Sequence, residues 1–122
     1  MLFRSLALGI AVAGCTAPAT DAAFVLYDGS IEGPSHLTSD LSVFTAINSG
    51  ERPHTLVVTT NDGSVVAASD LIQPGETARL AVELRPGVFQ VSCRIVVEND
   101  DGELIDHYEL GMRHTVNVTA QS

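Results

Sequence analysis

The stretch from Pro86 to Val118 concentrates the side chains of this chain that are best suited to binding a metal ion. It contains Cys93, His107 and Met112, with thirteen residues between the cysteine and the histidine and four between the histidine and the methionine. A thiolate, an imidazole and a thioether form a soft ligand set, and blue-copper sites combine two histidines, one cysteine and a weakly bound methionine. The rest of the chain would have to supply the second histidine.

The segments around these residues have the pattern of short strands separated by turns. Strands are predicted at 24–28, 41–48, 54–60 and 77–84, with a short edge segment at 64–69, and turn residues lie between them. No window shows a sustained helical period. Several short strands at this spacing predict an all-β sandwich or barrel.

Side-chain alternation along the strands indicates where the candidate ligands point. Cys93 falls in phase with the apolar residues of its strand, His54 begins a strand with its ring towards the core, and Met112 falls in phase with the last strand. Three strand ends can therefore converge at one pole of a sandwich. The alternative for Cys93 is a buried, inert thiol, because free cysteine packs well as a small hydrophobic residue.

Residues 1–14 have the features of a signal peptide, with Arg4 followed by a short apolar run. The sequence from Val12 to Cys15 resembles a bacterial lipobox, which implies cleavage before Cys15 and lipidation of its sulfur. The alternative is an ordinary signal peptide in which Cys15 is coincidental. We expect a lipidated cysteine and short tether at 15–23, a domain at 24–122, and export to the extracytoplasmic, periplasmic face of the membrane.

The composition limits the partners that the domain can have. The 122 residues carry six arginines, no lysine and fifteen acidic residues, for a formal charge of −9. This balance argues against nucleic-acid binding and against electrostatic adhesion to anionic lipid. It suits a soluble monomer with a basic protein partner.

Three segments together resemble the cupredoxins, the family that includes plastocyanin and azurin. Residues 48–54 (NSGERPH) resemble the segment that carries the first histidine ligand, and residues 73–93 resemble the hairpin that leads to the cysteine. Residues 107–118 resemble the closing turn from histidine to methionine and the last strand. The resemblance implies a Greek-key β-sandwich that binds one copper ion, Cu(I) or Cu(II), and transfers electrons.

The resemblance also assigns roles to individual residues. It implies His54, Cys93 and His107 as copper ligands, with Met112 as a weak axial ligand. It further implies that His107 lies near the surface and that Asn48 bonds across to the loop around Cys93; the alternative for Asn48 is that it only ends a strand.

The thirteen residues between Cys93 and His107 depart from plastocyanin and azurin, in which only a few residues separate these ligands. Residues 99–102 (NDDG) form a strong turn signal between two apolar flanks. We therefore expect an inserted hairpin that leaves and returns to nearly the same point.

The function expected is one-electron transfer between extracytoplasmic redox partners, without catalysis, because only His36 and His114 remain as further ligands. Two alternatives remain: a module that stores or hands over Cu(I) without redox cycling, and a metal-free interaction domain. The acidic run in residues 98–109 is either a solvated loop or a docking surface for a redox partner such as a basic cytochrome.

Overall fold

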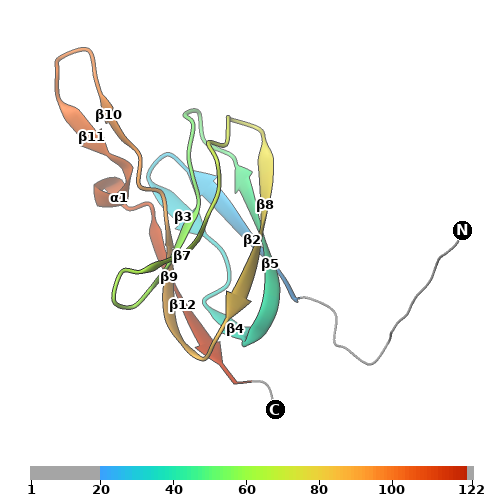
Figure 1. The fold of residues 1–122 in the computed structure, drawn as a ribbon. Coiled ribbons are helices and arrows are strands. Elements are labelled where there is room, and N and C mark those ends of the chain that lie inside the picture. Colours follow the sequence, from blue (N-terminus) through green and yellow to red (C-terminus); the bar gives the residue numbers. More distant parts are fainter. Residues whose placement is uncertain (1–19, 121–122) are drawn as a thin grey trace, which may run out of the picture.

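Two β-sheets packed face to face form the body of the protein in the computed structural model, which describes residues 20–120 (Figure 1). The four-stranded sheet has the order β3-β2-β5-β8, and the five-stranded sheet has the order β4-β12-β9-β6-β7. The predicted all-β sandwich is confirmed. The strands of the first sheet are β2 (Thr20–Tyr27), β3 (Ser30–Glu32), β5 (Asp40–Asn48) and β8 (Thr77–Leu84); those of the second are β4 (His36–Thr38), β6 (Val57–Thr60), β7 (Val65–Ala68), β9 (Gly87–Ser92) and β12 (Arg113–Thr119).

The first sheet begins earlier in the chain than the sequence pattern indicated. β2 starts at Thr20 and runs parallel to β5 from that residue on, so residues 20–23 belong to the sheet and not to the tether expected there. Ala22 continues the inward alternation of Phe24 and Leu26, and all three side chains are buried. The predicted signal peptide and Cys15 lie outside the described residues.

The second sheet carries the segments that lead to the candidate ligands. β9 pairs antiparallel with β12 over six residues and with β6 on its other side, while β4 runs parallel to β12. Strands that are distant in the sequence thus lie side by side, as the expected Greek-key arrangement requires. β7 is one of the two edge strands of this sheet, as predicted, and β4 is the other.

The core between the two sheets is aliphatic and aromatic. The rings of Phe24 and Phe44 pack with their centroids 5.0 Å apart, and Leu56, Val58 and Val91 are fully buried beside them. Each such side chain contributes about 1.5–3 kcal/mol by leaving water. This core makes the sandwich a rigid frame for the side chains at its end.

A hairpin projects from one end of the sandwich, as Figure 1 shows. It consists of β10 (Val96–Glu98) and β11 (Leu104–Asp106), which pair antiparallel with each other and form a separate two-stranded sheet. The inserted hairpin expected between Cys93 and His107 is therefore confirmed. A short helix, α1 (His107–Leu110), follows β11 and was not predicted from the sequence, because four residues are too few to show a helical period.

Candidate metal centre

Three buried side chains bring one nitrogen or sulfur atom each to a common point at the hairpin end of the sandwich. The Nδ1 atoms of His54 and His107 lie 3.2 Å apart, and Cys93 Sγ lies 3.9 Å from the first and 3.6 Å from the second. The exposed fraction of each residue is 1% or less. The structure thus gathers three of the predicted ligands from segments far apart in the sequence.

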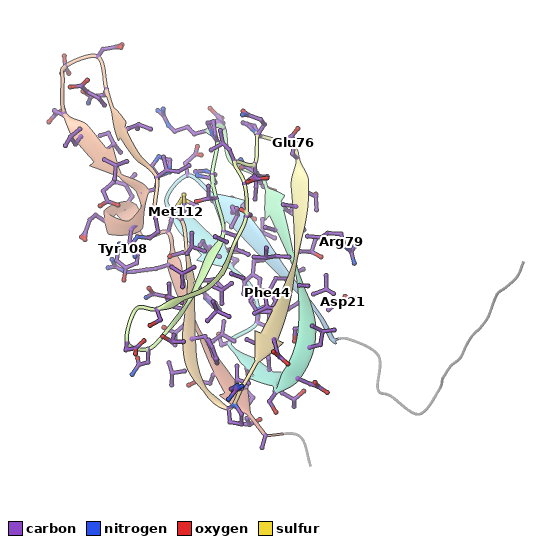
Figure 2. All side chains as sticks on the ribbon, viewed as in Figure 1. Asp21, Phe44, Glu76, Arg79, Tyr108 and Met112 are labelled. Carbon is purple, nitrogen blue, oxygen red and sulfur yellow. The ribbon has the colours of Figure 1, made fainter. Side chains whose placement is uncertain are left out.

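Met112, the predicted fourth ligand, lies next to Cys93 across the sheet. The Cys93 amide donates to the Met112 carbonyl over 3.0 Å, which extends the β9–β12 ladder by one residue pair. The Met112 side chain is fully buried, and Figure 2 shows it at the end of the sandwich near α1. Cys93 and Met112 therefore reach the same pole from neighbouring strands.

His107 is held near Cys93 by the hairpin. β10 and β11 pair with Val96 opposite Asp106, and the His107 amide donates to the Ile95 carbonyl over 2.9 Å, so the ladder continues to the base of the hairpin. Asp106 caps α1 by accepting a hydrogen bond from the Tyr108 amide over 2.9 Å. The insert thus leaves the sandwich and returns to almost the same place.

Gly111 ends α1 and turns the chain towards Met112. Its φ is +119°, and a Cβ there would lie 2.6 Å from the Gly29 carbonyl oxygen, so both backbone and space require glycine. The Met112 amide then donates to the His107 carbonyl over 3.1 Å. One tight turn therefore fixes the distance between the second histidine and the methionine.

Asn48 organises the loop that leads to His54. Its Nδ2 donates to the carbonyls of Arg52 and Ile72 over 2.8 and 2.9 Å, and its Oδ1 accepts from the Gly50 amide. The expectation that Asn48 bonds to the loop around Cys93 is not met. Asn48, the last residue of β5, bonds instead to the loop before His54 and to the Ile72 carbonyl.

Asp28 contacts His54 from the far side of the imidazole ring. Asp28 Oδ1 lies 2.9 Å from His54 Nε2. Burial raises the pKa of Asp28, but hydrogen bonds from the Glu51 amide and from His54 outweigh this effect and leave the pKa below its ordinary value. Nothing in the sequence pattern singled out Asp28, which follows β2 and meets the loop only through the parallel pairing of β2 with β5.

Thr55 is a second neighbour that the sequence reasoning missed. Its backbone amide lies 3.5 Å and its hydroxyl 3.8 Å from Cys93 Sγ, and both can donate to the sulfur. Its position directly after His54 is the only signal that could have indicated this role. Hydrogen bonds to a ligating sulfur stabilise the thiolate and tune the metal that it binds.

The protonation of the two imidazoles favours a bound cation. Because Asp28 accepts at His54 Nε2, that nitrogen carries the proton and His54 Nδ1 is a lone pair facing His107 Nδ1. Burial lowers the pKa of His107; the positive charge of Arg52 acts in the same direction, as would that of a protonated His54, so this ring favours the neutral form that binds metals. His107 Nε2 is buried without a hydrogen-bond partner.

The spacing of the three donor atoms fits a single metal ion. Donors about 2.0–2.3 Å from an ion, at the angles of a three- or four-coordinate site, lie roughly 3.1–3.8 Å apart. The separations of 3.2, 3.6 and 3.9 Å are close to this range. Among the described residues, no other group of histidine, cysteine and acidic side chains has such an arrangement.

The two remaining histidines lie away from this centre. His114 Nε2 bonds to the Pro34 carbonyl over 2.9 Å and to Ser35 Oγ over 3.3 Å. His36 lies in β4, at the edge of the five-stranded sheet. Neither belongs to the donor cluster, in agreement with the sequence analysis.

A groove of about 620 Å³ lies between the sandwich and the hairpin, and His107 is one of its lining residues. His107 was expected near the surface. It lines this groove, but only 1% of the residue is exposed. Ile95, Val97 and Ile105 of the insert line the groove together with His107. Apolar side chains form most of the lining: Pro53, Leu71, Ile95, Val97, Ile105 and Leu110.

Loss of the Asn48 side chain should loosen the loop that positions His54. Asn48→Ala removes three hydrogen bonds from a buried position, and at about 1 kcal/mol for each bond we expect a loss of about 2–4 kcal/mol in unfolding free energy. Urea unfolding measures it. The exposed Asn61→Ala is the control and should stay within about 0.5 kcal/mol of the native protein; equal losses in both variants would contradict this role.

No family model matches the chain, and no curated protein matches it either. Several solved structures, however, are similar to this chain in fold. A dithionite-reduced auracyanin from Roseiflexus castenholzii is 16% identical with a TM-score of 0.62, covering 85% of this chain and 99% of its own. Auracyanin A, a "blue" copper protein from Chloroflexus aurantiacus, is 10% identical with a TM-score of 0.59 and coverage of 81% and 99%.

A purple cupredoxin from Nitrosopumilus maritimus is 15% identical with a TM-score of 0.53, over 80% of this chain and 99% of its own. At such low identity these similarities concern the fold. The buried cluster of two histidines and a cysteine, with Met112 bonded to Cys93 through the backbone, is a property of this chain's own side chains. The chain therefore has the β-sandwich fold of these cupredoxins, with a cluster that could hold one metal ion at the end of the sandwich.

Proposed function

We propose that this protein binds one copper ion and transfers single electrons. The observation that carries the proposal is the convergence of two imidazole nitrogens and one sulfur, all buried, on a frame of β-strands. Bound copper would supply the one-electron couple between Cu(I) and Cu(II). His54, Cys93 and His107 would hold it, with Met112 as a weak fourth ligand.

The chain's own residues would keep the site nearly unchanged between the two oxidation states. Cys93 provides a thiolate, and the Thr55 amide and hydroxyl can donate to its sulfur. Asn48 holds the His54 loop, and the base of the hairpin holds His107. A mixed set of soft sulfur and imidazole ligands suits both oxidation states moderately, so little movement is needed on electron transfer.

The groove beside His107 and the acidic hairpin support a role in docking a basic redox protein. The groove offers an apolar contact above the ring, and the carboxylates of Asp100, Asp101 and Glu103 surround the exposed tip of the hairpin. Charges placed in this way accelerate encounter with an oppositely charged partner and fix its orientation. The partner fitted to this surface has an apolar patch ringed by lysine or arginine, as a basic cytochrome can have.

The proposed place of work is the outer face of the cytoplasmic membrane or the periplasm, with Cys15 as a lipid anchor. The support is the lipobox-like sequence from Val12 to Cys15. Within residues 20–120 there is no helix with the length and apolar character needed to cross a membrane. Electron transfer without catalysis is the activity proposed.

The ligand set predicts a ranking of variants. Cys93→Ser should abolish the visible absorption of the Cu(II) protein, because charge transfer from a thiolate has no counterpart with a hydroxyl. His54→Ala and His107→Ala should weaken copper binding by about 10-fold or more, while Met112→Leu keeps copper and changes the reduction potential. Copper titration followed by visible absorption and potentiometry measures all three effects.

His36→Ala and His114→Ala are the matched controls and should leave the spectrum unchanged. A Cys93→Ser protein with full colour and full copper affinity would disprove the site. Tight, colourless binding of Cu(I) by the native protein, without a reversible couple, would instead indicate a copper-handling module.

The charge of the hairpin should determine the rate of docking. Replacing Asp100, Asp101 and Glu103 by Asn, Asn and Gln should slow electron transfer to a basic cytochrome about tenfold at low salt, because steering is lost. The difference should disappear at high ionic strength, since screening acts over about 8 Å even at 0.15 M. Stopped-flow kinetics at several salt concentrations measures it.

The control removes the same charge elsewhere, by replacing the exposed Asp21, Glu32 and Glu83 with Asn, Gln and Gln. It should change the rate far less. Equal slowing by both triple variants would mean that only net charge matters and would exclude the hairpin as a docking surface.

Lipidation is tested with Cys15→Ser. The variant should leave the membrane fraction and appear in the soluble fraction, because several acyl chains anchor a protein stably and their loss removes the anchor. Its copper spectrum should be that of the native protein. Retention in the membrane fraction would show that Cys15 is not the anchor.

A further inference from the structure

His54 and His107 differ in what their outer ring nitrogens contact. His54 Nε2 lies 2.9 Å from a carboxylate oxygen of Asp28, whereas His107 Nε2 is buried without a partner. His54 is fully buried, and the Asp28 side chain is 39% exposed. A carboxylate thus contacts one imidazole of the cluster directly, whereas the outer nitrogen of the other has no hydrogen-bond partner.

The Asp28 carboxylate is held in place by the backbone of the His54 loop. The Glu51 amide lies 3.0 and 3.1 Å from its two oxygens, and the Arg52 amide lies 3.2 Å from Oδ1. With His54 Nε2, three N–H groups converge on Oδ1. The carboxylate is therefore fixed as an acceptor and cannot turn away from the imidazole without losing several bonds.

Gly50 makes room for this contact. A Cβ at residue 50 would lie 2.3 Å from Asp28 Oδ1 and 2.9 Å from His54 Nε2. Gly50 is not among the glycines of the described chain with positive φ, so its backbone conformation is open to other residues. Residue 50 is therefore required to be glycine because the Asp28–His54 pair occupies the space of a side chain, and not because of its backbone conformation.

A carboxylate that accepts from the outer nitrogen of a ligating histidine has two effects. It selects the tautomer with the proton on Nε2, which leaves Nδ1 free as a ligand, and it makes that nitrogen more basic. Its negative charge also stabilises a doubly charged metal ion more than a singly charged one. The first effect acts through the imidazole ring, and the second acts through space.

We propose that Asp28 is a positioning residue which orients His54, fixes its Nε2–H tautomer and makes the site prefer Cu(II) over Cu(I). The proposal rests on the copper function proposed above and deepens it. In this proposal Asp28 influences the reduction potential although it is not itself a copper ligand.

Asp28→Asn is the main test, because it keeps the shape of the side chain and removes its charge. We expect the ratio of Cu(II) to Cu(I) dissociation constants to rise about tenfold, the lower end of the usual effect of such partners. For one electron, this corresponds to a rise of about 59 mV in reduction potential. Gly50→Ala should shift the potential in the same direction by displacing the carboxylate, and Asp28→Glu should recover part of the native value.

Glu51→Gln is the matched control. It removes one negative charge from the same loop, while the Glu51 backbone amide still donates to Asp28. It should shift the potential by less than a third as much as Asp28→Asn. An equal shift would show that loop charge alone acts through space, and no shift in Asp28→Asn would show that Asp28 does not tune the site; either outcome overturns the proposal.

The tautomer is measured separately in copper-free protein, by nitrogen-15 NMR of the His54 ring. The native protein should carry the proton on Nε2, and Asp28→Ala should lose this preference. A native Nδ1–H tautomer would refute the positioning role whether or not copper binds. A native protein that binds no copper would disprove the copper function and the effect on potential, and the NMR result would still decide the role of Asp28 in orienting His54.

Discussion

The antiparallel pairing of β9 with β12 is the contact on which the candidate metal centre depends. It extends beyond both strands through the hydrogen bond from the Cys93 amide to the Met112 carbonyl, and so places the sulfur-bearing residues side by side at one end of the sandwich. Every other candidate ligand is positioned relative to this pair. Since a β-ladder sets side-chain direction with period two, a slip of one residue would turn Cys93 away from the core.

Each remaining ligand is attached to this frame by a different local device. His54 sits on a loop held by the side chain of Asn48 and by a bridge to Ile72. His107 sits at the base of a hairpin whose ladder ends with its own amide. The long insert therefore adds little to the free-energy cost of bringing Cys93 and His107 together. Loop-closure entropy grows only slowly with length, and the two ends of the insert are paired.

The charges of the molecule are arranged unevenly around this buried centre. The hairpin tip carries exposed carboxylates, the groove beneath it is mostly apolar, and one carboxylate, that of Asp28, reaches a histidine of the cluster. A charge at the tip acts over long distances and is screened by salt, whereas a charge in contact with a buried ring is screened much less. The same residue type thus carries a charge exposed to solvent at one place and a charge in contact with a buried histidine at another.

The local sequence pattern was enough to predict much of the fold and most of the candidate ligands of this protein. The alternation of apolar residues predicted the sandwich, the NDDG turn predicted the hairpin, and the types and spacing of Cys93, His107 and Met112, with His54 upstream, indicated the cluster. These features could be predicted because strand periodicity and turn chemistry depend on residues that are neighbours in the chain.

Contacts between distant segments were decided only by the tertiary structure. The parallel pairing of β2 with β5 brought Asp28 to His54 and extended the sheet back to Thr20, and the end of β5 placed Asn48 beside the His54 loop. The pairing at the base of the hairpin placed His107, which is buried, beside Cys93. Such contacts depend on strand order and register. These are decided when the whole core packs, and no local sequence pattern indicates them.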